Sequence, residues 1–120
     1  MKKQENNERS LTTPEELAEL ASLYDSYGVL LKENQQDIFE AYVLDNLSLS
    51  EIADEQGMTR QGVYDTINRS RKKLREYESR MRIIEKADAI ERHLSEIEKL
   101  VESKNMTIIR GHISEIRDLL

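Results

Sequence analysis

Apolar residues recur every three to four positions along most of the chain, and this spacing predicts a structure built from helices. The first stripe follows Thr13–Glu16, where Thr at the N-cap, Pro at the first helical position and Glu at the third make a capping box. Gly28 is expected to end this helix. A second helix is expected from Glu33 to Asp45. The two stripes consist of Leu17, Leu20, Ala21, Tyr24 and Tyr27, and of Ile38, Phe39, Tyr42 and Val43.

Residues 48–75 predict a helix-turn-helix. Ser48 and Glu51 form a second capping box, which opens a short helix. Gly57 supplies the left-handed backbone that a sharp turn needs, and Thr59 caps a longer second helix. The small core expected between the two helices consists of Ile52, Met58, Val63 and Ile67. The alternative is an ordinary helical corner with a basic exposed face, but the coincidence of caps, glycine turn and basic charge favours the helix-turn-helix.

The last third of the chain changes its apolar period. From Ile83 to Val101 apolar residues are spaced as in a heptad seam, out of register with the preceding helix, so a break is expected near residues 80–84. A turn at 103–105 and a cap at Thr107 predict a final helix and hence an antiparallel hairpin. The two apolar rows consist of Ile83, Ala87, Ile90, Leu94, Ile97 and Val101, and of Ile109, Ile113, Ile116 and Leu120.

This seam suits either the inside of the hairpin or a dimer interface. A homodimer is favoured, because the stripe is longer than a small helix-turn-helix domain needs and because two copies would present two reading helices. The expected organisation is a disordered tail over residues 1–12, a helix-turn-helix domain over 13–82 and a dimerising hairpin over 83–120. No internal repeat is evident from the pattern.

Charge is distributed unevenly along the chain, whose formal net charge is −6. Residues 1–58 carry 13 acidic and 4 basic side chains, whereas residues 59–82 carry 8 basic and 3 acidic ones. One positive segment in an acidic chain is typical of an element that binds anions. The overall acidity argues against a protein that coats nucleic acid indiscriminately.

Several function classes find no support in the composition. The chain has no cysteine, so it can form no disulfide and no cysteine-based metal site. Its 2 histidines alone do not make a convincing metal site. His93 and His112 are expected to be two separate exposed polar positions. No nucleophile–base pair, phosphate loop or pair of catalytic carboxylates stands out, so we expect neither an enzyme nor a bound cofactor. No apolar run is long enough for membrane insertion, and we expect a cytoplasmic protein.

The second helix of the helix-turn-helix carries the candidate binding residues. Side chains that can read base edges stand at its start, and a basic run that can contact phosphates follows. Tyr64 could equally pack within the domain, and the basic run could be a solvated face paired with Glu76 and Glu78. The candidates for base reading are Arg60, Gln61, Tyr64 and Asn68, and those for phosphate contact are Arg69, Arg71, Lys72 and Arg75.

Two families share these motifs. The segment from Leu49 to Val63, with Arg69–Arg75, resembles region 4 of bacterial sigma factors, which reads the promoter −35 element. A longer stretch, roughly residues 17–100, resembles the YlxM family. The similarity includes Leu23-Tyr-Asp-Ser-Tyr-Gly-Val-Leu-Leu and is sharpest at Thr59-Arg-Gln-Gly-Val-Tyr-Asp-Thr-Ile-Asn-Arg. The family often has Thr where this chain has Glu33.

The resemblance implies an all-helical protein with a helix-turn-helix like that of sigma region 4, and a regulatory role linked to the signal recognition particle by gene neighbourhood. Two hypotheses follow. The first is a dimeric, sequence-specific DNA-binding regulator of transcription. The second is an accessory protein that binds the RNA or protein components of the signal recognition particle.

Overall fold

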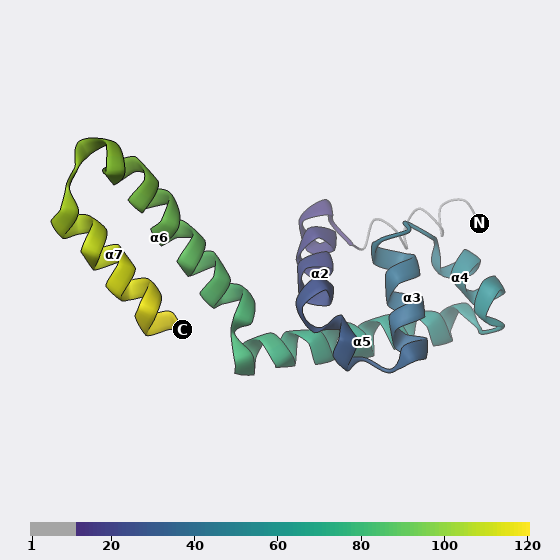
Figure 1. Ribbon diagram of the computed structural model, residues 1–120. Coiled ribbons are helices and arrows are strands. Elements are labelled where there is room, and N and C mark those ends of the chain that lie inside the picture. The colour runs from purple at the N-terminus through teal and green to yellow at the C-terminus, as the bar shows by residue number, and fades with distance from the viewer. Residues whose placement is uncertain (1–11) are drawn as a thin grey trace. The chain divides into compact units, whose positions relative to one another are not determined.

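The computed structural model describes residues 12–120, and within that range it contains helices and no strand. The prediction of an all-α protein is therefore confirmed for the described residues. Figure 1 shows the order of the elements along the chain. They are α2 (Pro14–Tyr27), the 3₁₀ turn η1 (Gly28–Leu30), α3 (Glu33–Val43), α4 (Leu49–Gln56), α5 (Arg60–Met81), α6 (Ile83–Ser103) and α7 (Met106–Leu119).

The described chain forms two compact units, one ending at Arg80 and the other spanning Met81–Leu120. Between α5 and α6 the backbone of Arg82 is left-handed, with φ 56°, which interrupts the helix. The break expected near residues 80–84 is thus confirmed. No helix in the described range combines the length and apolar character that crossing a membrane requires.

The predicted tail falls almost entirely on residues 1–11, which lie outside the described residues. Thr12, at its end, is described and is only 6% exposed. Its hydroxyl lies 2.8 Å from the hydroxyl of Tyr42 on α3, within hydrogen-bonding distance. Ordered packing of the first unit therefore begins no later than Thr12.

The helix caps of the first unit follow the sequence closely. At the start of α2 the backbone amide of Glu16 donates to the Thr13 hydroxyl, but among the described contacts the Glu16 carboxylate does not bond back to Thr13, so the predicted capping box is only half formed. Ser48 and Glu51 make both bonds of a capping box at the start of α4. The Thr59 hydroxyl accepts from the amide of Gly62 at 3.0 Å. These bonds satisfy amides that a helix N-terminus leaves without a partner in the helix, so each helix begins where its cap predicts.

Glycines stop two helices for different reasons. Gly57 follows α4 in the left-handed region, with φ 63°, as the sharp turn was predicted to require. Gly28 is right-handed, with φ −55°. A Cβ atom there would lie 2.7 Å from the ring of Tyr24, so the space beside that ring requires glycine at this position. The chain then continues as η1 before turning into α3.

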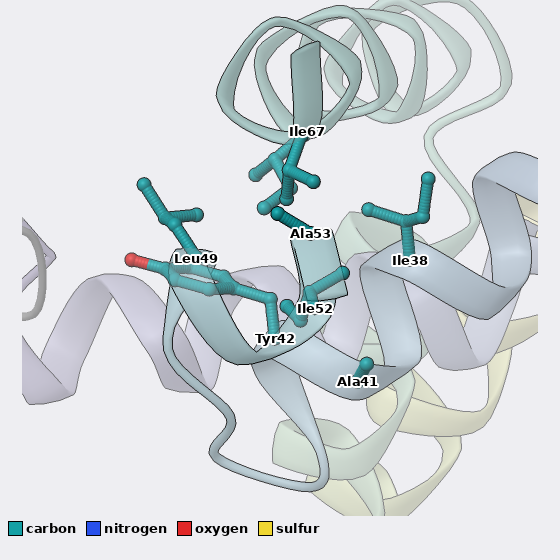
Figure 2. Close-up of a cluster of buried hydrophobic side chains, with 8 residues drawn as sticks. Ile38, Ala41, Tyr42, Leu49, Ile52, Ala53 and Ile67 are labelled. Atoms are coloured by element: carbon teal, nitrogen blue, oxygen red, sulfur yellow. The ribbon is translucent and has the colours of Figure 1, made fainter. Parts of the chain in front are cut away.

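The core of the helix-turn-helix is formed by α3, α4 and α5 together. Figure 2 shows side chains from the three helices converging on α4. Ile52 is fully buried and Ala53 is 6% exposed, as expected where two helices cross closely. Met58 was expected in this core, but it is 36% exposed and lies outside the buried cluster. The buried cluster comprises Ile38, Ala41, Tyr42, Leu49, Ile52, Ala53, Val63 and Ile67.

The second unit is an antiparallel pair of helices joined by a tight turn (Figure 1). Lys104 is left-handed, and the Asn105 side chain, not Thr107 as predicted, accepts from the amide of Ile108 and begins α7. The two helices pack through one face each. After the first turn of α6, the half-buried or buried positions of the two helices are Ala89, Ile90, His93, Ile97, Leu100, Ile109, His112, Ile116 and Leu119.

The two histidines meet across this hairpin. Their Nδ1 atoms lie 2.6 Å apart and their ring centroids 4.9 Å apart. The expectation of two separate exposed positions is therefore wrong, since each imidazole is half-buried against the other. The pairing also reveals a short sequence repeat that was not recognised from the pattern. Its two copies are His93-Leu-Ser-Glu-Ile97 and His112-Ile-Ser-Glu-Ile116, and in each copy the histidine and the last isoleucine are the residues that pack inside the hairpin.

Candidate nucleic-acid interface

The burial pattern of α5 fixes which side of the helix remains available for binding. Its buried residues fall on one stripe that packs against the rest of the first unit. Because α-helix positions turn about 100° per residue, the side chains of Gln61, Tyr64, Asn68 and Lys72 lie on the opposite side or beside it. Tyr64 is 40% exposed. The buried stripe consists of Val63, Thr66, Ile67, Ser70 and Leu74.

Two neighbouring hollows bring most of the candidate residues onto one surface. Tyr64, Asn68 and Arg71 line a hollow of about 140 Å³ at the start of this surface. Asn68 and Arg71 also line the next one, together with Lys72 and Arg75. The sequence alone could place these residues on one helix, and the structure shows that they share one continuous face.

The start of α5 carries one acidic side chain that the sequence analysis did not consider. The side-chain amide of Gln61 donates through Nε2 to the carboxylate of Asp65 at 3.0 Å. This bond orients Gln61 and places an acceptor among the candidate base-reading residues. A carboxylate can accept from the exocyclic amine of cytosine but repels phosphate, so it would add base discrimination and not general affinity. Arg60, one residue earlier, is half-buried.

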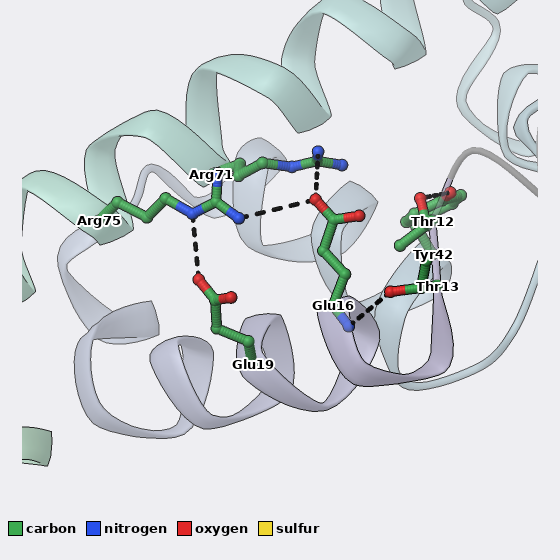
Figure 3. A network of polar contacts seen from close by, with 7 residues as sticks. All are labelled: Thr12, Thr13, Glu16, Glu19, Tyr42, Arg71 and Arg75. Atoms are coloured by element: carbon green, nitrogen blue, oxygen red, sulfur yellow. Dashed lines mark hydrogen bonds and ion pairs between the residues drawn. The ribbon is translucent and has the colours of Figure 1, made fainter.

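Arg71 and Arg75 have carboxylate partners on α2. Figure 3 shows the guanidinium of Arg71 pairing with Glu16 at 3.3 Å, and that of Arg75 pairing with Glu19 at 3.1 Å. Arg75 also reaches Glu16 at 3.6 Å. The alternative partners considered from the sequence were Glu76 and Glu78, so the residues that neutralise this run were missed.

No local signal could have identified these partners. Glu16 lies 55 positions before Arg71 in the sequence, and its role at the helix cap looked sufficient. In the structure the Glu16 backbone completes the cap while its carboxylate turns to α5. These pairs hold α2 against α5, and they also reduce the positive charge that α5 presents. Surface pairs of this kind contribute about 0–1 kcal/mol each, so phosphate could compete for the arginines.

Two candidates for phosphate contact differ in their surroundings. Lys72 is exposed and makes no ion pair within residues 12–120. Arg69 donates to the Thr66 hydroxyl at 3.3 Å. Counting 100° per residue, Arg69 lies on the other flank of α5 from Asn68 and Arg71. The structure therefore does not bring Arg69 together with the others.

Over the described range no group of three or more potential metal-ligating side chains is found.

Comparison with known proteins gives a consistent result. Residues 14–113 match the model of the UPF0122 family, described as "Putative helix-turn-helix protein, YlxM / p13 like". A UPF0122 protein of Symbiobacterium thermophilum is 37% identical over 98 residues, which is 82% of this chain and 92% of that protein. Another, of Shouchella clausii, is 44% identical over 81 residues, covering 68% of this chain and 74% of that protein.

The matched region spans all the helices of the first unit, including the turn at Gly57 and the face of α5. It also includes α6 and the first half of α7. The resemblance found from the motifs at residues 17–100 is confirmed. The chain belongs to the UPF0122 family of YlxM-like helix-turn-helix proteins.

Proposed function

We propose that this protein is a cytoplasmic, sequence-specific DNA-binding regulator of transcription that uses α5 as its reading helix. The observation that carries the proposal is the shared face of α5, on which Tyr64 and Asn68 lie beside Arg71 and Lys72. Amide side chains discriminate adenine in the major groove, and basic side chains hold the phosphates on either side. The protein acts by binding and not by catalysis.

The ion pairs between α2 and α5 determine which basic side chains are available to DNA phosphates. Lys72 supplies general attraction, whereas Arg71 and Arg75 become available to phosphate only by exchanging Glu16 and Glu19 for the DNA backbone. Non-specific binding is then weak, because the exchange is favourable only where base contacts hold the helix in the groove. An acidic chain whose one basic face is partly neutralised by ion pairs is better suited to sequence-specific DNA binding than to non-specific binding along DNA.

A selection experiment tests sequence reading. The full chain would be used to enrich a pool of random duplexes, and the enriched duplex would be compared with its scrambled version. We expect at least a tenfold preference, and we expect Gln61→Ala and Asn68→Ala to reduce that preference. Lys99→Ala on α6 is the matched control, since Lys99 is an exposed residue of the second unit. A pool that yields no enriched sequence contradicts the proposal.

We further propose that the hairpin of α6 and α7 joins two copies. Leu94 and Ile113 each follow the histidine of their own helix by one residue and therefore lie about 100° around from it. In an antiparallel pair, equal turns bring both residues to the same side of the hairpin. Both are more than two-fifths exposed, and Val101 is 58% exposed. An apolar face of this kind on a two-helix unit fits a second, identical hairpin.

An accessory role at the signal recognition particle is the second candidate function. It is favoured by the acidity of the rest of the chain, since residues 1–58 carry 13 acidic and 4 basic side chains and suit a protein partner better than RNA. Competition at fixed salt between the enriched duplex, the particle RNA and the particle protein distinguishes the two. Preference for the duplex supports the first function, and preference for a particle component supports the second.

A further inference from the structure

A groove on the first unit lies away from the face of α5 and has no part in the DNA-binding proposal. It runs between the outer sides of α2 and α3 and has a volume of about 310 Å³. Figure 1 shows that α2 and α3 run in opposite directions. The bond from Tyr24 to Glu40 joins the two helices across the groove. Its lining consists of Ala21, Tyr24, Asp25, Gly28, Val29, Gln36, Glu40 and Leu44.

The two ends of this groove are apolar and exposed. At one end Val29 is 84% exposed, and its neighbour Leu30 is 51% exposed. At the other end Leu44, which follows α3, is 55% exposed. Single exposed apolar side chains are common on protein surfaces. Here, however, Val29 and Leu44 both line one groove, so a single ligand could cover the two together.

The middle of the groove is acidic. The phenol of Tyr24 donates to Glu40 at 2.8 Å. Burial, the bond to Glu40 and the nearby charges of Glu40 and Asp37 together raise the pKa of Tyr24 above its ordinary value. Asp25 adds a further carboxylate, and no lysine or arginine lines the groove. A ligand that lies here must therefore bring positive charge to its own centre.

The floor of the groove is held in place before any ligand binds. The Tyr24 ring stacks on Phe39 with centroids 5.4 Å apart, and Phe39 is completely buried. The absent side chain of Gly28 leaves room for the same ring. A rigid floor lowers the entropy lost on binding, which is typical of a preformed docking site.

We propose that this groove binds an amphipathic, basic helix of a partner protein. From Ala21 to Val29 the α2 side of the groove covers about 12 Å, at roughly 1.5 Å per residue. Two apolar side chains seven residues apart on a bound helix would span about the same length. They would cover Val29 and Leu44, and a lysine or arginine between them would meet Asp25 and Glu40. RNA and anionic lipid are excluded as occupants by the charge of the groove.

The test uses a defined peptide and the full chain. The probe is an 18-residue helical peptide with leucines at positions i, i+7 and i+8 and lysines between them. A second peptide has glutamate at every lysine position. Amide chemical shifts of the isotopically labelled protein locate the binding site, and their concentration dependence gives the dissociation constant. We expect shift changes around Tyr24, Val29 and Leu44, and at least tenfold weaker binding of the glutamate peptide.

Three variants make the test specific. Val29→Ser with Leu44→Ser removes both apolar ends and should weaken the lysine peptide by roughly tenfold or more. Glu40→Gln keeps an acceptor for Tyr24 while removing a charge, so it should weaken binding of the lysine peptide several-fold and should not weaken binding of the glutamate peptide. Met106→Ser is the matched control, because Met106 is an exposed apolar residue at the start of α7, outside the groove and outside the face of α5.

The outcomes are distinct from those of the DNA experiments. No binding of the lysine peptide at millimolar concentration overturns the proposal, as do shift changes that fall on α5 or on the hairpin. Equal binding of the two peptides also overturns it, because the acidic centre would then have no role. DNA binding by α5 is measured separately, so failure at the groove leaves that proposal standing and failure at α5 leaves the groove proposal standing.

Discussion

At the scale of single residues, the turn between α4 and α5 depends on Gly57. Its φ of 63° is unfavourable for residues with a branched Cβ, although a Cβ placed there would meet no neighbour within 4 Å. Gly57→Val should therefore lower the free energy of unfolding by roughly 1–2 kcal/mol through backbone strain alone. Urea denaturation of the full chain measures this loss.

Gly57→Asn is the matched control for that variant. Asparagine tolerates left-handed backbone better than valine does, so its loss of stability should be clearly smaller. Equal losses for the two substitutions would show that the cost comes from something other than the turn conformation.

Glu16 offers a second test at this scale, because it restrains the arginines of α5. Glu16→Gln removes the charge that pairs with Arg71 and lies near Arg75. If these arginines exchange carboxylate for phosphate, duplex affinity should rise by up to about fivefold while unfolding stability falls by up to about 1 kcal/mol. Fluorescence anisotropy with a labelled duplex measures the affinity.

Glu15→Gln changes the net charge equally at an exposed neighbouring position and controls for long-range attraction. A rise in affinity that is the same for both variants would mean that the ion pair with Arg71 has no specific effect.

Residue roles could be predicted from the sequence where they depend on nearby positions. Thr13, Ser48 and Thr59 were recognisable as caps because a cap and its amide lie within three residues of each other. The pairing of Arg71 with Glu16 depends on how α2 packs against α5, and no periodicity contains that information. The burial of Met58 was also mispredicted, because Met58 lies in the turn between α4 and α5 and therefore outside the apolar stripe of either helix.

At the scale of elements, the hairpin shows both the value and the limit of apolar spacing. The spacing predicted two helices and a turn, and the structure has both. The predicted row on α6 is divided, however. Ile90 and Ile97 face α7, whereas Leu94 and Val101 remain exposed. Two adjacent apolar rows on one helix look like a single broad stripe, so the sequence could not tell which row packs inside the hairpin.

The exposed row leads to a prediction about self-association. Leu94→Glu should abolish dimers of the full chain at micromolar concentration, because a charge would be placed in the proposed apolar interface. Ser95→Glu is the matched control, since Ser95 is exposed and lies another 100° around the helix. Sedimentation velocity compares the two variants with the unaltered chain.

A monomeric unaltered chain would contradict the dimer, and so would a Ser95→Glu variant that dissociates as readily as Leu94→Glu. Either result would also remove the basis for two DNA half-sites recognised by a symmetric pair of α5 helices.

At the scale of the whole molecule, the distribution of charge links the fold to its proposed function. The sequence showed one basic segment in an acidic chain, and the structure shows that part of this charge is neutralised by α2. The candidate surface was predictable because it lies on one helix. Its electrostatic strength was not, because that depends on contacts between distant segments. The groove between α2 and α3 was missed for the same reason.

The most direct test of the central claim is a comparison of Arg60→Ala and Lys72→Ala binding to the preferred duplex and to unrelated duplexes across a range of salt concentrations. If α5 reads DNA, the Arg60 variant should lose about 1–3 kcal/mol on the preferred duplex and little elsewhere. The Lys72 variant should weaken every duplex about equally and flatten the log–log salt slope by about one unit. The claim is contradicted if both variants bind every duplex as well as the Lys99→Ala control does.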